Sequence, residues 1–359
     1  MHLQPTEICC HFALKNAYIR LMNLYLTEQG LKVKRERKRL QFFRQDTLVY
    51  EIRLDDLSHV FVFGRIHFTA QALQALLKHE IDVHFLNTSG KYLGRLSPPR
   101  GKNIELRLAQ FRTFDNEEKR LLLARAFIKA KIDNQRAYLR RQNRKLKDES
   151  ISKTILELRK KAREAHEAKD LETLRGIEGQ AAHIYFSVYG KLFQVKGLSF
   201  PGRIRRPPPD PINALLSLGY TLLCAQITSF LEMSGLDPHL GYLHAPDYGR
   251  PSLSLDVMEE WRPVIVDSLV VRLFNWGTIK PKDFTEEPWD DDEDFSIVRL
   301  SPEGLRKFLD QFRKRMDEKA LYQRVGKEFT YRDIIKNQIW HLARVLKGEE
   351  DNYQGFVFP

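Results

Sequence analysis

The stretch Ser97-Pro98-Pro99-Arg100-Gly101 separates two parts of the sequence that follow different patterns. Adjacent prolines followed by a glycine interrupt both helices and strands, so this stretch predicts a domain boundary. Ahead of it, short runs rich in β-branched and aromatic residues alternate with turn signals, which is typical of a sheet. Beyond it, long segments rich in Ala, Leu, Glu, Lys and Arg predict helices. The sequence therefore predicts an α+β fold, with a small β-sandwich-like domain over residues 22–98 and a larger all-helical domain over residues 102–346.

The predicted β domain contains short strands and one helix. Thr69 is a suitable N-cap, and Ala72, Leu73, Leu76 and Leu77 after it share one helical face. Strands are expected at residues 24–27, 31–33, 40–43, 47–52, 60–63 and 81–86.

The predicted helical domain is interrupted by a proline-rich connection at residues 200–211, because Pro207, Pro208 and Pro209 cannot propagate a helix. The segment that follows is apolar enough for a buried core helix, and Pro263 lies inside a later one. Helices are expected at residues 106–116, 118–147, 151–169, 171–188, 212–234, 254–275, 302–319 and 331–346. Outside the two domains, residues 1–21 are expected to be an N-terminal extension and residues 347–359 a C-terminal tail.

Composition favours a soluble protein that attracts polyanions. The 359 residues are 42% hydrophobic and 30% charged, which suits two globular domains. Apolar runs such as Ala214 to Leu223 are shorter than the roughly 20 residues of a membrane helix, and no signal-peptide pattern begins the chain. We therefore expect a cytosolic protein with no membrane partner. Three cysteines exclude a disulfide framework. The net charge of +12 favours nucleic acid, although a merely soluble basic protein would fit equally well.

Charged residues are distributed unevenly along the chain. Lys and Arg outnumber Asp and Glu between Arg100 and Lys147, and a second basic cluster runs from Lys32 to Arg39. Both predict a track for DNA, or a solvated helix and hairpin surface. The acidic run from Asp290 to Asp294 is expected to be a solvated loop and not a metal site.

The segment from His244 to Pro263 gathers side chains that bind metals. His244 lies in a loop with glycine and proline, and Asp256 and Glu259 are three residues apart, so both carboxylates lie on one helical face. One imidazole and two carboxylates can hold a hard divalent cation such as Mg²⁺ or Mn²⁺. A solvated helix face is the competing interpretation. The spacing also does not choose between Glu259 and Glu260, because Glu260 is four residues from Asp256.

Two further segments carry features that suit contact with DNA. In Arg175-Gly176-Ile177-Glu178-Gly179, glycines flank a glutamate inside a helical segment, at a cost of roughly 1 kcal/mol each relative to alanine. Close approach of another helix or of a phosphate backbone would offset that cost, and a loosely formed helix end would also explain it. Arg203, Arg205 and Arg206 lie on the stiff loop before Asp210, which suits phosphate contact or a solvated basic loop.

In this order, the segments resemble the CRISPR adaptation integrase, the near-universal spacer-acquisition protein of those systems. The resemblance covers roughly residues 22–346. It rests on the β-rich start, on Arg175-Gly176-Ile177-Glu178-Gly179, on Arg-Arg-Pro-Pro-Pro-Asp-Pro-Ile-Asn-Ala-Leu-Leu-Ser at residues 205–217, and on His244 followed by Asp256-Val-Met-Glu259-Glu260-Trp-Arg-Pro.

The resemblance implies a role for each matched side chain. Glu178, His244 and Glu259 are the implied ligands of Mg²⁺ or Mn²⁺, and Asp256 is an implied fourth member of the catalytic site. The basic side chains implied to face DNA are those of Arg175, Arg250 and Arg262.

The resemblance also implies a reaction and partners. The 3′-hydroxyl of a short donor DNA attacks a phosphodiester at the edge of a CRISPR repeat. The protein is expected to form a homodimer and to assemble with a small ferredoxin-like adaptation protein. Two alternatives stay open: a metal-dependent nuclease of branched or single-stranded DNA that does not integrate, and a non-catalytic DNA-binding scaffold. Residues 1–21 are either an added segment or the remnant of a fusion, for example with a reverse transcriptase.

Overall fold

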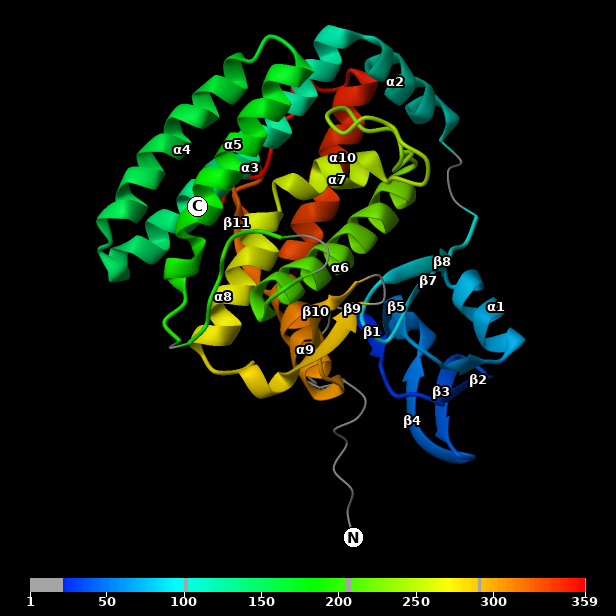
Figure 1. The fold of residues 1–359 in the computed structure, drawn as a ribbon. Coiled ribbons are helices and arrows are strands. Elements are labelled where there is room, and N and C mark those ends of the chain that lie inside the picture. Colours follow the sequence, from blue (N-terminus) through cyan, green and yellow to red (C-terminus); the bar gives the residue numbers. More distant parts are fainter. Residues whose placement is uncertain (1–21, 100–102, 196, 205–207, 290–291, 359) are drawn as a thin grey trace. The chain divides into compact units, whose positions relative to one another are not determined.

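The computed structural model (Figure 1) describes residues 22–99, 103–195, 197–204, 208–289 and 292–358. The chain divides into two compact units, one of residues 1–100 with 300–313 and the other of residues 101–299 with 314–359. The boundary between residues 100 and 101 falls in the stretch where the sequence predicts one. Residues 300–313, expected in the helical domain, instead group with the β-rich unit. The expected extension, residues 1–21, lies outside the described residues.

The β-rich unit contains two four-stranded sheets. The first has the order β1-β5-β7-β8, in which β1, β5 and β7 are parallel and β8 is antiparallel to β7. The second has the order β4-β3-β2-β6. The strands are β1 (Met22–Leu26), β2 (Lys32–Glu36), β3 (Arg39–Arg44), β4 (Thr47–Arg53), β5 (Leu57–Phe63), β6 (His67–Phe68), β7 (Asp82–Leu86) and β8 (Tyr92–Leu96).

One hydrophobic core joins these two sheets. Val60 and Val62 of β5 lie in it with Val33 of β2 and Phe42 of β3, and Leu76 enters it from helix α1 (Ala70–Lys78). Alternate residues of a strand point to opposite faces, so each sheet contributes one apolar face to this core. The predicted sandwich-like domain is confirmed.

The second unit is mostly helical, and α3 packs against both α4 and α5. Its helix α6 is long and apolar enough to cross a membrane by length and composition, but 78% of its most apolar window is buried in the protein, as in a core helix. The helices are α2 (Ile104–Asp115), α3 (Glu117–Leu146), α4 (Glu149–Glu167), α5 (Leu171–Tyr189), α6 (Pro211–Ser234), α7 (Ser252–Glu259), α8 (Ser268–Asn275) and α10 (Tyr331–Lys347), with α9 (Pro302–Asp317) beginning in the first unit.

The prediction that this region is all-helical is wrong in detail. Strand β9 (Phe284–Trp289) pairs with β10 (Asp292–Leu300), and β11 (Lys319–Tyr322) pairs with β12 (Lys327–Thr330). Strands β9, β11 and β12 have six residues or fewer, and all four strands contain charged residues, so their apolar alternation is too short or too weak to predict strands. The loop expected at residues 290–294 is instead a strand from Asp292 onward, because that residue begins β10. Residues 290 and 291 lie outside the described part.

The long helix expected at residues 254–275 is divided in the structure. Helix α7 ends at Glu259, the π-helical segment η3 (Arg262–Asp267) follows, and α8 begins at Ser268. Pro263 has no N–H and its ring would clash with the carbonyl of Glu259 in a regular α-helix, so the chain widens here. The break falls directly after the predicted metal ligand.

Candidate metal centre

Two predicted metal ligands meet at the ammonium group of a lysine. Glu178 projects from α5 and Glu259 from the last residue of α7. Nζ of Lys131, from α3, pairs with Oε1 of Glu178 and lies 2.6 Å from Oε2 of Glu259. Three helices distant in sequence thus bring two carboxylates to one cationic position. Among the described residues, Glu259 Oε2 has no hydrogen bond beyond this ion pair.

The electrostatics of this group keep its members charged. Burial by itself raises the pKa of Glu259, but the charges of Arg262, Lys131 and His244 more than offset it and lower the pKa to about 2. Burial likewise acts to lower the pKa of Lys131, and the carboxylates of Glu259 and Glu178 raise it instead. Glu259 therefore presents an ionised carboxylate, the form that a metal ion requires.

His244 is oriented by a buried carboxylate. Its Nδ1 lies 2.6 Å from Oδ1 of Asp256, which is fully buried. This contact leaves Nε2 as the ring nitrogen able to reach a cation, as in carboxylate–histidine–metal arrangements. His244 also lies close enough to Glu259 to interact with it electrostatically.

Asp256, in helix α7, holds the loop that carries His244. Its Oδ2 accepts hydrogen bonds from the backbone N–H groups of Tyr242 (2.5 Å) and Leu243 (3.0 Å), and its Oδ1 accepts one from that of His244 (3.0 Å). Both oxygens are therefore engaged in holding the loop. Its contacts make Asp256, predicted as catalytic, a positioning residue for His244.

The structure separates Glu259 from Glu260, which the sequence spacing could not do. Oε1 of Glu260 accepts a hydrogen bond from the Tyr353 hydroxyl (2.9 Å), and its Oε2 accepts one from the Phe356 backbone N–H (2.8 Å). Glu260 thus holds the C-terminal tail, whereas Glu259 faces Lys131. Burial raises the pKa of Glu260 to about 8.

The four described arginines predicted to face DNA differ in the ion pairs and hydrogen bonds that they form within the protein. Nη2 of Arg262 pairs with Oε1 of Glu259 at 3.1 Å, and Nη2 of Arg175 donates to the Leu243 carbonyl at 2.7 Å. Nη1 of Arg203 donates to Oδ1 of Asn213 at 2.8 Å. These three guanidinium groups shape the site, whatever else they contact. Arg250 is half-buried in the loop after His244, and Arg205 and Arg206 lie outside the described residues.

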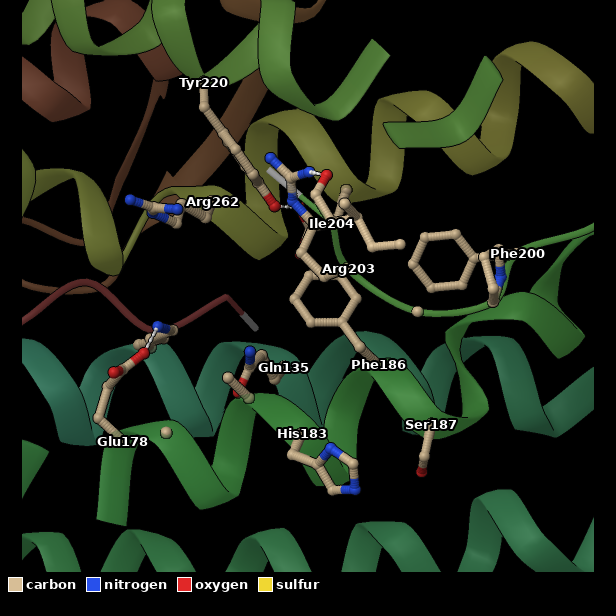
Figure 2. Close-up of a pocket in the computed structure, with 16 residues that line it drawn as sticks. Gln135, Glu178, His183, Phe186, Ser187, Phe200, Arg203, Ile204, Tyr220 and Arg262 are labelled. Atoms are coloured by element: carbon tan, nitrogen blue, oxygen red, sulfur yellow. Dashed lines mark hydrogen bonds and ion pairs between the residues drawn. The ribbon is translucent and has the colours of Figure 1, made fainter. Parts of the chain in front are cut away.

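A cavity of about 650 Å³ adjoins the centre (Figure 2). Glu178 and His183 line it on one side, from α5, and Arg203, Tyr220 and Arg262 line the opposite side. The cavity therefore has a carboxylate at the proposed ligand position and two guanidinium groups facing it, which suits a phosphate group near a metal ion.

The two glycines beside Glu178 lie in regular helix and not at a frayed end. Gly176 and Gly179 are both exposed in α5, and a Cβ built on either would meet nothing within 4 Å. Close packing of another part of the chain therefore does not explain them. Of the explanations that the sequence offered for these two glycines, the approach of a ligand such as a phosphate backbone is the one that remains.

Elsewhere, the described residues contain another group able to bind a metal. His59 of β5 and Asp82 and His84 of β7 offer ligand atoms within 4.8 Å of one another, and all three are buried. Their side chains lie on the face of the sheet opposite to Val60 and Val83, and all three also interact with other groups of the chain. The sequence did not predict this group, which stands as a rival position for a cation.

Comparisons with known proteins define the family to which this chain belongs. The sequence model of the family described as CRISPR associated protein Cas1 matches residues 24–314. The chain is 36% identical over 342 residues to "CRISPR-associated endonuclease Cas1 3" of Thermus thermophilus, covering 95% of this chain and 96% of the relative. The chain therefore belongs to the Cas1 family of CRISPR adaptation proteins.

Solved structures agree with this assignment. The fold matches a casposase bound to its integration product, with a TM-score of 0.79 and 28% identity over 93% of this chain and 92% of that one. It also matches a chain of a Cas6-RT-Cas1–Cas2 complex, with a TM-score of 0.81 and 26% identity over 96% of this chain and 37% of that one.

Sequence reasoning missed Lys131, although a signal was present. Lys131 is four residues after Phe127 and three after Ile128, so it lies on the apolar face of α3. A charged residue on such a face usually has a buried partner of opposite charge. Gly241 was missed as well: a Cβ there would lie 2.9 Å from Oδ2 of Asp256 and 2.6 Å from the Cβ of Ser252.

Proposed function

We propose that this protein is a divalent-metal-dependent DNA nuclease and integrase of CRISPR adaptation, with Glu178, His244 and Glu259 as the ligands of Mg²⁺ or Mn²⁺. The observation that carries the proposal is the shared cationic position between Glu178 and Glu259, next to a histidine oriented by Asp256. Two carboxylate oxygens and one imidazole nitrogen fit a hard divalent ion. The names of the relatives, an endonuclease and a casposase with its integration product, support the same activity.

The proposed reaction is the attack of a donor DNA 3′-hydroxyl on a phosphodiester of the repeat. When bound, the metal ion supplies charge stabilisation at the phosphoryl and leaving oxygens and helps to activate the hydroxyl. Asp256 fixes the imidazole of His244, and Arg262 fixes the carboxylate of Glu259. Arg203 and Arg262 supply positive charge along the cavity wall, where they can align a phosphate.

The proposed partners are DNA, a second copy of this chain and the small ferredoxin-like adaptation protein. The matched structure named as a Cas6-RT-Cas1–Cas2 complex supports such an assembly. The net charge of +12 supports binding to DNA, whose affinity for the protein should then fall steeply with salt.

Single substitutions at the proposed ligands test the activity. Glu178→Ala and His244→Ala should abolish strand transfer of a labelled donor end while most DNA affinity remains, because the Lys and Arg side chains that attract the backbone are unchanged. Lys153→Ala, which alters an exposed lysine of α4, is a control expected to retain wild-type product. Undiminished joined product from His244→Ala would refute the assignment.

Product analysis distinguishes integration from cleavage alone. Joined molecules support an integrase, whereas free ends without joined product indicate the nuclease alternative. A scaffold without catalysis would give neither product, with or without a chelator of divalent ions.

A further inference from the structure

A lysine ammonium occupies the position that the proposed metal ion needs. Nζ of Lys131 pairs with Oε1 of Glu178 and Oε2 of Glu259. Only 7% of the Lys131 side chain and 4% of the Glu259 side chain are exposed. Water screens these charges poorly, so the carboxylates depend on a nearby cation.

An ammonium and a divalent ion cannot both occupy the space between Oε1 of Glu178 and Oε2 of Glu259. A metal–carboxylate bond of about 2.0–2.2 Å would bring the ion to the space that Nζ fills, where two cations would repel each other strongly. The other oxygen of Glu259 is already 3.1 Å from Nη2 of Arg262. A metal ion bound between Glu178 and Glu259 therefore requires the ammonium to move.

We propose that Lys131 is a tethered cation that competes with the divalent ion for Glu178 and Glu259 and so sets the metal affinity of the centre. This inference rests on the proposed metal centre. Without metal, Lys131 forms an ion pair with both carboxylates. With metal, its ammonium withdraws into the adjoining cavity, which Lys131 itself lines and which has a volume of about 650 Å³.

Mn²⁺ titration of the full-length protein without DNA, followed by the electron paramagnetic resonance signal of free Mn²⁺, tests the competition. Lys131→Met keeps a side chain of similar length and removes the charge. It should bind Mn²⁺ at least roughly ten-fold more tightly than the wild type, because the competing cation is gone. Its unfolding temperature without metal should fall, since Glu178 then loses this ion pair and the buried carboxylate of Glu259 keeps only Arg262 beside it. A purely structural lysine would give unchanged or weaker Mn²⁺ binding.

Two variants serve as controls. Lys129→Met removes the same charge from the same helix, but Nζ of Lys129 pairs with Asp133 at 2.7 Å and contacts neither carboxylate of the centre. It should bind Mn²⁺ as the wild type does. Lys131→Arg retains a cation and should bind Mn²⁺ no more tightly than the wild type.

Unchanged or weaker Mn²⁺ binding by a folded Lys131→Met protein overturns the competition. If that variant does not fold, the wild type with bound Mn²⁺ decides: Nζ should lie more than about 4 Å from both carboxylates, and retained ion pairs would overturn the proposal. If the Glu178→Ala and Glu259→Ala variants bind Mn²⁺ with the same affinity as the wild type, that result would contradict the metal centre itself, and not the competition alone.

Discussion

At the scale of single residues, the site depends on charged side chains that pair with one another. The spacing of Asp256 and Glu259 in the sequence suggested that they form part of a metal site. In the structure Asp256 contacts His244, and Glu259 contacts Lys131. The spacing of two residues along a helix predicts whether their side chains lie on the same face, but not which residues of other elements contact that face. The pairing of Glu178 with Glu259 could not be predicted from residue patterns, because it depends on how α5 and α7 pack around α3.

Asp267 lines the cavity and gives the protein a pH-dependent stability. Burial raises its pKa to about 6, and the hydrogen bond that it accepts from the Tyr220 hydroxyl (2.5 Å) only partly offsets this. The folded protein therefore binds a proton that the unfolded chain has lost, and stability falls as the pH rises from about 3.8 to about 6. At about 1.4 kcal/mol per pKa unit, the loss is about 3 kcal/mol at most.

Asp267→Asn should remove this loss. The amide oxygen can still accept from Tyr220, so the variant should unfold at a higher temperature than the wild type at pH 7 and should approach it near pH 4. Asp115→Asn, which neutralises an exposed carboxylate of α2, should track the wild type. Stability curves of Asp267→Asn and the wild type that run parallel between pH 4 and pH 7 would contradict the role given to burial.

At the scale of elements, the sequence predicted helices and strands well where the apolar periodicity extends over a long segment. The cap at Thr69 is confirmed, since its side chain accepts from the Ala72 N–H at 3.3 Å. The buried helix expected at residues 212–234 is α6. The strands β11 and β12 were missed because each has four residues, too few for an alternation to register. The sequence predicted one helix that continues through Pro263, and the π-helical break found there depends on the surrounding packing.

Helix α5 makes a prediction that separates stability from function. Gly176→Ala should stabilise the protein by about 0.5–1 kcal/mol, because alanine favours a helix and its Cβ meets nothing within 4 Å. If the DNA backbone approaches this open surface beside Glu178, the same change should weaken DNA binding at constant salt. Thermal unfolding and a DNA titration measure the two effects. Raised stability with undiminished DNA affinity would show that the glycine serves no ligand.

At the scale of the whole molecule, the predicted tail turned out to be part of the helical unit. The residues after 346 pack back against the helical unit, where Phe356 stacks on Trp261 with ring centroids 4.6 Å apart. Nδ2 of Asn134 donates to the carbonyls of Glu260 and Phe356, each at 2.8 Å. One polar residue of α3 thus ties the tail to the end of α7. Such a long-range contact has no local sequence signal.

The central claim is that one divalent ion lies between Glu178, Glu259 and His244. A crystal of the full-length protein soaked in Mn²⁺ and measured at the manganese absorption edge tests it most directly. The account predicts an anomalous peak within bonding distance of both carboxylates and of Nε2 of His244. A peak at His59, Asp82 and His84 with none beside Glu178, or no protein-bound peak at all, would contradict it.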